Sequence, residues 1–241
     1  MDSQLIIESS PHIRDNDSVS KIMWAVVLAL IPSGLAGIYY FGIRALVVMG
    51  VCVGACLMCE WVFQKIRKKE TNLCDGSAIL TGLLLSYNLP SNIPLWVCVL
   101  GSVFSIVIAK QVFGGLGHNI FNPALAGRAF LLISYPVYMT NWPAPTPGVI
   151  FSHLDGVTSA TPLGMVKEGL TGQLPSYWQL FIGNRGGCIG EVCIAALLLG
   201  VLYLLWRRCI SWHTPVSFIA ATGLCLWVFG GKGGLLKGDV L

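Results

Sequence analysis

The chain has 241 residues, of which 55% are apolar and 11% are charged, and its mean hydropathy is +0.73. Soluble domains carry roughly 25% charged residues, so a soluble globule of this size could not cover its surface with so few charges. The low charge and the lack of a repeat also exclude a disordered or fibrous chain, and the composition therefore indicates an integral membrane protein.

The apolar runs and the breakers between them predict membrane segments over 22–41, 43–63, 77–89, 94–112, 123–139, 188–206 and 213–230. A spanning helix needs about 20 residues, so segment 77–89 is too short to span comfortably. Segment 123–139 begins at Asn122-Pro123, a helix N-cap followed by a first-turn proline. Short segments of this kind often line a site. The predicted fold is all-α: a polytopic transmembrane helical protein with broken helices and one long outer-face loop.

The basic residues predict the orientation and the organisation of the chain. With the polar segment 1–21 in the cytoplasm, most of them fall on the cytoplasmic side, including the cluster Lys65–Lys69 and Lys110. The longest connection, 140–187, then lies on the outer face between membrane segments 22–139 and the last part, 188–241. Because the basic residues mark helix ends, the net charge of +4 predicts no nucleic-acid partner.

A few charged side chains fall within or beside the apolar segments. Glu60 is either a solvated charge near a helix end, beside Lys65, or a functional group within the membrane. Asp75 is expected to cap the short segment that follows it. Arg128 must find water, a carboxylate, or the phosphate of a flavin or lipid. Glu191 is expected to reach the membrane interface.

The nine cysteines and the glycine-rich turn support no strong site. Cys52, Cys56 and Cys59 could share one helix face and hold a metal or cluster, but no histidine joins them and each lies in an apolar run. Small apolar side chains are the favoured interpretation. The string 114–119 lacks the strand and spacing of a dinucleotide fingerprint and predicts a tight reversal. No metal ligands and no catalytic residues are predicted.

The outer loop contains a candidate attachment point at Thr161-Pro162. A threonine before a proline predicts an N-cap and the first turn of a short helix, 162–169. As a bare string, capping alone is the favoured interpretation. The same geometry presents a hydroxyl that another enzyme could reach, and the orphan N–H groups of the helix would meet a phosphate esterified to it.

Resemblance to a known family adds what these patterns leave open. The string Asp155-x-x-Thr158-Ser159-Ala160-Thr161 resembles the motif of flavin transferases, which couple FMN through its phosphate to the final threonine. Further motifs follow in the family's order: Ser9-Ser10-Pro11-His12, Asp75-Gly76-Ser77-Ala78, Thr81-Gly82-Leu83-Leu84-Leu85 and Gly117-His118-Asn119-Ile120-Phe121-Asn122-Pro123-Ala124. Over essentially its whole length, the chain resembles the RnfD subunits of Rnf complexes and, more distantly, the NqrB subunits of sodium-pumping NADH:quinone reductases.

The resemblance implies a multi-pass subunit of the bacterial inner membrane that relays electrons between ferredoxin and NAD while the complex moves Na⁺ or H⁺. FMN would be joined to Thr161 by a phosphoester, which makes the chain a flavoprotein and a phosphoprotein. Asp155, Thr158, Ser159 and Ala160 would serve recognition, and Arg128 is a candidate cofactor contact. A second, non-covalent flavin, riboflavin, is implied near the broken segments without assigned residues. The implied partners are Rnf subunits A, B, C, E and G, membrane lipid and a flavin transferase.

Two departures and three alternatives accompany this expectation. The family often has Gly where this chain has Ser159, and it usually continues through further membrane helices, whereas this sequence ends at Leu241. An NqrB-like component of a quinone reductase is one alternative. A secondary transporter with a substrate site between segments 77–89 and 123–139 is another, and a purely structural subunit is the third. The last two predict no covalent cofactor.

Overall fold

The computed structural model describes residues 18–68, 73–148, 161, 164–165 and 175–229, and its elements are helices. The first two, α1 (Val19–Phe41) and α2 (Ile43–Ile66), are long and apolar enough to cross a bilayer, and shorter apolar helices follow them. The chain is an all-α membrane protein, as predicted.

The remaining elements follow the predicted segments but divide several of them. They are η1 (Leu73–Asp75), α3 (Ser77–Tyr87), α4 (Leu95–Val103), the π-helix η2 (Phe104–Gln111), α5 (Pro123–Ser134), α6 (Pro136–Met139), α8 (Tyr177–Ile182), α9 (Ile194–Trp206) and α10 (His213–Phe229). Segment 94–112 is thus an α-helix that continues as a π-helix. Segment 123–139 is broken at Tyr135-Pro136, because the residue before a proline disfavours helical backbone.

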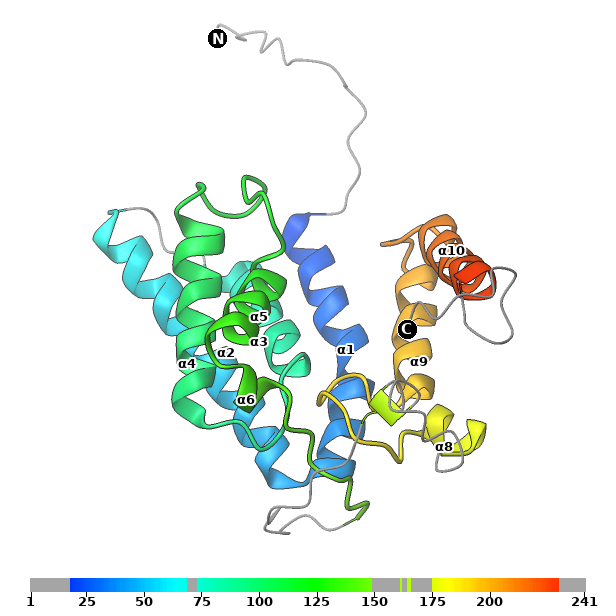
Figure 1. Ribbon diagram of the computed structural model, residues 1–241. Coiled ribbons are helices and arrows are strands. Elements are labelled where there is room, and N and C mark those ends of the chain that lie inside the picture. Colours follow the sequence, from blue (N-terminus) through cyan, green and yellow to red (C-terminus); the bar gives the residue numbers. More distant parts are fainter. Residues whose placement is uncertain (1–17, 69–72, 149–160, 162–163, 166–174, 230–241) are drawn as a thin grey trace, which may run out of the picture.

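The helices run between two ends of the molecule (Figure 1). The N-side end holds the start of α1, the end of α2 and the turn between η2 and α5. The far end holds the junction of α1 and α2, the turn 88–94 and the described parts of 140–193. Hydrogen bonds agree with this division, since Trp24 Nε1 donates to Cys74 O at the N-side end and Thr146 N donates to Tyr40 O at the far end.

A non-helical segment at 186–190 is buried against the end of α3. Gly190 N donates to Tyr87 O over 3.0 Å, and Ile189 N donates to Leu89 O over 3.1 Å. Ser33 Oγ of α1 donates to Gly190 O over 2.5 Å. Irregular backbone within a membrane protein persists only where the protein satisfies its polar groups, and these bonds do so. The prediction of a membrane helix beginning at 188 is wrong, since α9 begins six residues later, at Ile194.

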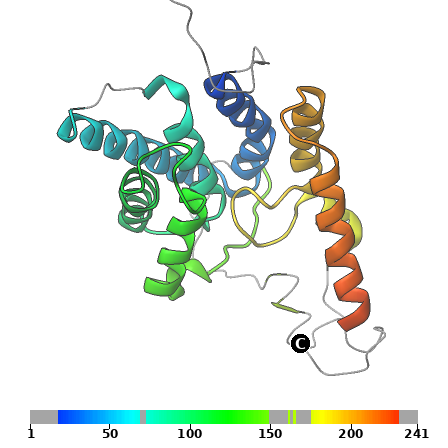
Figure 2. The same cartoon turned by 90° about the horizontal axis from the view of Figure 1, so that it is seen from above.

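Helix α10 extends away from the helices around α2, as the view from above shows (Figure 2). Its apolar side chains are largely exposed, with Phe218 at 73% and Trp227 at 60%. In a membrane this surface faces hydrocarbon or a neighbouring helix, so α10 contributes little to the site described below.

Candidate functional site

Glu60 of α2 and Lys110 of η2 form an ion pair inside the protein. Each residue is 2% exposed, and Lys110 Nζ lies 2.8 Å from Glu60 Oε1 and 2.9 Å from Oε2. The interpretation of Glu60 as a solvated end charge is therefore wrong, and Lys110 is buried with it, while the assignment of Lys110 to the cytoplasmic side stays a prediction. Each residue lies near the C-terminus of its helix, at the N-side end of the molecule. The packing of η2 against α2 turns the two side chains toward each other.

Further hydrogen bonds extend the ion pair into a network. Lys110 Nζ donates to Ser77 Oγ over 2.6 Å, and Ser77 Oγ donates to Asp75 Oδ1 over 2.9 Å. Gln111 Nε2 donates to Glu60 Oε1 over 2.9 Å. We call Asp75, Ser77, Lys110, Glu60 and Gln111 the buried network. A buried charge pair is tolerated when its remaining donors and acceptors are satisfied, which these bonds achieve.

The π-helical winding of η2 brings two consecutive side chains to the same carboxylate. Val112 N donates to Val107 O, five residues earlier, over 3.0 Å. Lys110 and Gln111 both contact Glu60 from this widened turn. Such π-helical turns within α-helices occur frequently at functional sites. The winding is therefore a local feature that shapes the network, and no pattern in the sequence predicted it.

Asp75 fixes the start of α3 as well as the outer end of the network. Its Oδ1 accepts a hydrogen bond from Ser77 N over 3.0 Å, and the intervening Gly76 has a φ of +77°. This left-handed conformation is one that glycine adopts readily. The N-cap residue of α3 is Gly76, so Asp75 lies one residue before the cap, although its carboxylate accepts the first N–H of the helix; Asp75 is half-buried at the N-side end.

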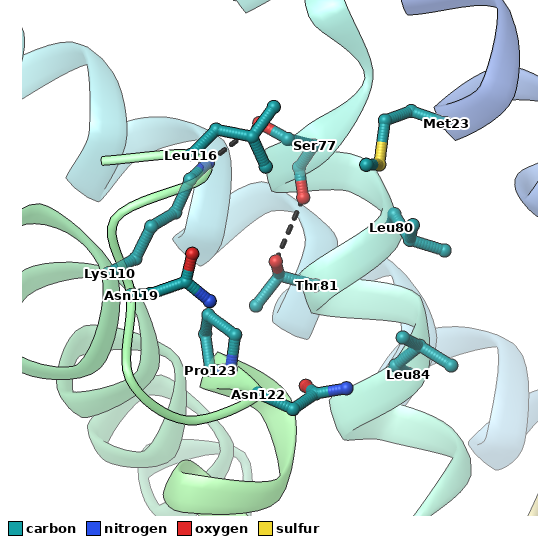
Figure 3. A pocket seen from close by; sticks show the side chains of 10 residues that line it. All are labelled: Met23, Ser77, Leu80, Thr81, Leu84, Lys110, Leu116, Asn119, Asn122 and Pro123. Atoms are coloured by element: carbon teal, nitrogen blue, oxygen red, sulfur yellow. Dashed lines mark hydrogen bonds between the residues drawn. The ribbon is translucent and has the colours of Figure 1, made fainter. Parts of the chain in front are cut away.

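A cavity of about 270 Å³ adjoins the buried network at the N-side end (Figure 3). It lies between α3 and the start of α5, which belong to the two segments predicted to be broken. Its walls carry a few polar groups among apolar side chains, namely Met23, Ser77, Leu80, Thr81, Leu84, Lys110, Leu116, Asn119, Asn122 and Pro123. A mostly apolar concave surface with a few placed polar groups is typical of ligand sites.

Three polar side chains of the cavity are fixed by hydrogen bonds to backbone atoms two to four residues away. Asn122 Oδ1 accepts from Ala124 N over 3.0 Å, which confirms the predicted N-cap before Pro123 and leaves the Asn122 NH₂ group as the donor for a ligand. Thr81 Oγ1 donates to Ser77 O over 2.8 Å, and Asn119 Nδ2 donates to Phe121 O over 2.9 Å. The cavity thus presents fixed hydroxyl and amide groups beside a buried ammonium.

A larger cavity, of about 670 Å³, lies between η2 and α5 but has a different chemistry. Phe104 and Phe130 stack there with ring centroids 4.3 Å apart, and apolar side chains form most of the wall. Only Asn122 and Ser134 bring polar side chains to it. The smaller cavity, which the buried network borders, is therefore the stronger candidate for a polar ligand.

Thr161, the predicted attachment point, has the geometry of an N-cap. Its Oγ1 accepts from Gly164 N over 3.2 Å, and its carbonyl oxygen accepts from Met165 N over 2.9 Å. The local capping prediction is confirmed to that extent, while most of the predicted helix 162–169 lies outside the described residues. So do the other motif residues, namely Asp155, Thr158, Ser159 and Ala160.

Arg128 of α5 is directed to the end of α3 and does not line the smaller cavity. Its guanidinium nitrogen Nη1 donates to Asn88 Oδ1 over 2.7 Å, so an amide takes the place of the water, carboxylate or phosphate expected from the sequence. Asn88 follows the last residue of α3, where the helix dipole favours a cation. A phosphate contact for Arg128 stays a prediction.

Of the other sequence candidates, Glu191 lies apart from the buried network, whereas Cys56 lies one helical turn before Glu60 on α2. Glu191 is exposed and precedes α9, and its Oε1 accepts from Cys188 N over 3.2 Å. Cys52 and Cys56 are fully buried on α2, and Cys59 is half-buried. Within the described ranges, no group of three His, Cys, Asp or Glu residues is placed to hold a metal ion.

Comparison with known proteins gives matches along nearly the whole chain. The model of the NQR2, RnfD, RnfE family matches residues 6–240. The chain is 46% identical over 241 residues to the D subunit of the proton-translocating ferredoxin:NAD(+) oxidoreductase complex of Clostridium ljungdahlii, covering 97% of this chain and 72% of that protein. It is 45% identical over 228 residues to the D subunit of the Na(+)-translocating ferredoxin:NAD(+) oxidoreductase complex of Acetobacterium woodii, covering 94% and 70%. The D subunit of the ion-translocating oxidoreductase complex of Colwellia psychrerythraea is 37% identical over 254 residues, covering 92% and 72%.

Proposed function

The chain belongs to the NQR2, RnfD, RnfE family, and we propose that it is a membrane subunit of an Rnf-type complex that couples electron transfer between ferredoxin and NAD to Na⁺ or H⁺ movement. The observation that carries this proposal is 46% identity over 97% of the chain to the D subunit of such a complex. The chain would work as an electron relay within the bacterial inner membrane. Its partners would be Rnf subunits A, B, C, E and G and membrane lipid.

We propose that Thr161 carries FMN as a phosphoester, installed by a flavin transferase. The hydrogen bond from Gly164 N uses a lone pair of the Thr161 hydroxyl oxygen and leaves its O–H to react. Once esterified, the phosphate would lie beside backbone N–H groups at the start of a helical turn, where an anion is favoured. Asp155, Thr158, Ser159 and Ala160 would serve recognition by the transferase. Bound FMN supplies the redox chemistry, and the chain positions it.

We also propose the smaller cavity as the site of the second, non-covalent flavin, riboflavin. Its walls offer hydroxyls at Ser77 and Thr81, amides at Asn119 and Asn122, and the Lys110 ammonium. A flat ring system with donors and acceptors on its edge suits a cavity that combines apolar walls with these few groups. Its volume of about 270 Å³ is close to the lower end of known ligand sites, roughly 300–1,000 Å³.

The positions of the two proposed flavin sites support a relay across the membrane. The cavity is lined by residues of the turn between η2 and α5, which belongs to the N-side end. The described residues that flank Thr161 in sequence, 140–148 and 175–187, lie at the far end (Figure 1). With the N-terminus in the cytoplasm, as the basic residues indicate, Thr161 would be on the outer face.

The test of the covalent site is flavin fluorescence in a denaturing gel, together with the mass of the intact chain. Chain co-expressed with a flavin transferase should fluoresce and gain the mass of FMN less one water. Thr161→Ala should abolish both signals, and Thr161→Ser, which keeps a hydroxyl, should retain them at least in part. Thr140→Ala is the matched control, because Thr140 Oγ1 donates to Pro136 O at the start of the same loop. Fluorescence that persists in Thr161→Ala would refute the assignment.

A secondary transporter is the alternative that one observation favours, because the cavity lies between two short helical segments. That function predicts no covalent flavin. The same gel therefore separates the two proposals.

A further inference from the structure

A continuous line of hydrogen bonds joins the N-side surface to the wall of the smaller cavity. It begins at the half-buried carboxylate of Asp75, passes through the hydroxyl of Ser77 and ends at the Lys110 ammonium. The two steps measure 2.9 Å and 2.6 Å. Ser77 and Lys110 both line the cavity (Figure 3). Each link is thus short enough for proton transfer between neighbours.

Every member of this line can both give and take a proton. Ser77 Oγ accepts from Lys110 and donates to Asp75 in the same arrangement, so its hydroxyl connects the two titratable groups. Glu60 contacts the Lys110 ammonium through both carboxylate oxygens. A neutral Lys110 would leave that carboxylate buried without a cation, which is costly and drives the amine to take a proton again.

We propose that Asp75, Ser77 and Lys110 are a proton relay that serves the ligand of the smaller cavity. The proposal rests on the proposed function, because reduction of a flavin there requires protons as well as electrons. It assigns Lys110 as the group that gives the proton, Ser77 as the connecting hydroxyl and Asp75 as the group that exchanges with water. Glu60 is a positioning residue that holds the Lys110 ammonium beside the cavity.

The relay moves one proton in four balanced transfers. Lys110 Nζ gives a proton to the reduced ligand, which breaks one N–H bond and leaves a neutral amine. The Asp75 carboxylate takes a proton from the solvent. Its O–H then passes this proton to Ser77 Oγ, while the Ser77 hydroxyl turns and donates its own proton to the neutral amine, and Asp75 is again a carboxylate. No electron moves along the chain, and oxidation of the ligand reverses each transfer.

Other titratable groups face this line and would share in its pH dependence. From α2 these are Glu60 and the thiol of Cys56, which interacts electrostatically with Lys110 and Glu60. From η1 it is Asp75, while α3 contributes the hydroxyl of Ser77. Titratable groups surround Lys110 on several elements, so a pH optimum alone could not be assigned to one of them. The test therefore removes one side chain of the relay at a time.

The experiment measures proton uptake when the bound flavin is reduced by light. The full chain is expressed without a flavin transferase, so that only non-covalent flavin reports, and a pH-indicator dye follows the protons in weakly buffered detergent solution. Ser77→Ala removes the connecting hydroxyl. Asp75→Asn keeps a capping oxygen but removes the carboxylate. Ser77→Thr restores a hydroxyl, and Ser86→Ala is the control on α3, because Ser86 Oγ donates to Leu83 O away from the cavity.

We expect uptake to slow by about 10- to 100-fold in Ser77→Ala and Asp75→Asn, within or just below the usual range for lost acid–base catalysis. In Asp75→Asn the flavin content, the midpoint potential and its pH dependence should stay as in the parent chain, because Asp75 does not line the cavity and the relay changes only the rate. Ser77→Thr and Ser86→Ala should resemble the parent. A structural role alone would instead lower the flavin content or shift the potential.

The outcomes separate the relay from the function on which it rests. The relay is overturned if Ser77→Ala and Asp75→Asn bind flavin at the parental content and take up protons at the parental rate. The cofactor proposal would then still stand. A parent chain that holds no non-covalent flavin overturns the cofactor proposal, and the relay with it. If Ser77→Ala loses its flavin, Asp75→Asn decides, since Asp75 does not line the cavity.

Discussion

Replacing Glu60 with glutamine should strongly destabilise the protein, because it leaves the Lys110 ammonium buried without an anion. Both residues are 2% exposed, and Glu60 accepts two hydrogen bonds from Lys110 at 2.8 and 2.9 Å and one from Gln111 at 2.9 Å. Removing one partner of a buried ion pair costs about 3–5 kcal/mol. For a chain of this size, each kcal/mol lowers Tm by roughly 2–4 °C, so the expected decrease is about 6–20 °C.

The assay is thermal unfolding of the purified chain in detergent, followed by loss of helical circular dichroism. The double variant Glu60→Gln/Lys110→Met should recover most of the loss, because it removes both charges and keeps an apolar side chain of similar length. Glu191→Gln is the matched control at an exposed position and should change stability by no more than about 0.5 kcal/mol. Equal Tm values for Glu60→Gln and Glu191→Gln, or a double variant as unstable as the single, would refute the reasoning.

Two further predictions concern helix packing and side-chain access. Gly82→Ala should lower the free energy of unfolding by about 1–3 kcal/mol, because the added Cβ would lie 2.7 Å from the backbone Cα of Val53 on α2. Gly54→Ala, which has open space around it, should be neutral or stabilising. Equal effects of the two substitutions on thermal unfolding would contradict this packing. A membrane-impermeant maleimide should label exposed Cys74 in inside-out vesicles but leave Cys188, which is 1% exposed, unmodified until the protein is denatured. Labelling of Cys74 only in right-side-out vesicles would reverse the proposed orientation.

The membrane class and the main helices could be predicted because they depend on local properties of the chain. Long apolar runs predict helices wherever they occur, and the first two helices begin or end within three residues of the predicted limits. The caps at Asn122 and Thr161 were also predictable, since a cap involves atoms only two or three residues apart. The family resemblance rested on several such motifs in order.

Partners that are distant in sequence could not be predicted in this way. Glu60 and Lys110 are separated by 50 positions, and either could have been a flanking charge at a helix end. Arg128 had several candidate partners, and Asn88 was not among them. The non-helical backbone before α9 was hidden because residues 188–193, apart from Glu191, are small or apolar and lead directly into the apolar helix.

The low fraction of charge by itself determined that this is a membrane protein, because few charges cannot cover a water-exposed surface. Only the tertiary structure decided which of those charges are inside. A charge in an apolar interior is tolerated solely beside its counter-charge and hydrogen-bond partners, and it is the packing of α2, α3 and η2 that brings Glu60, Ser77 and Lys110 together. That juxtaposition places a buried ammonium on the wall of a cavity, where the sequence alone indicated a helix end.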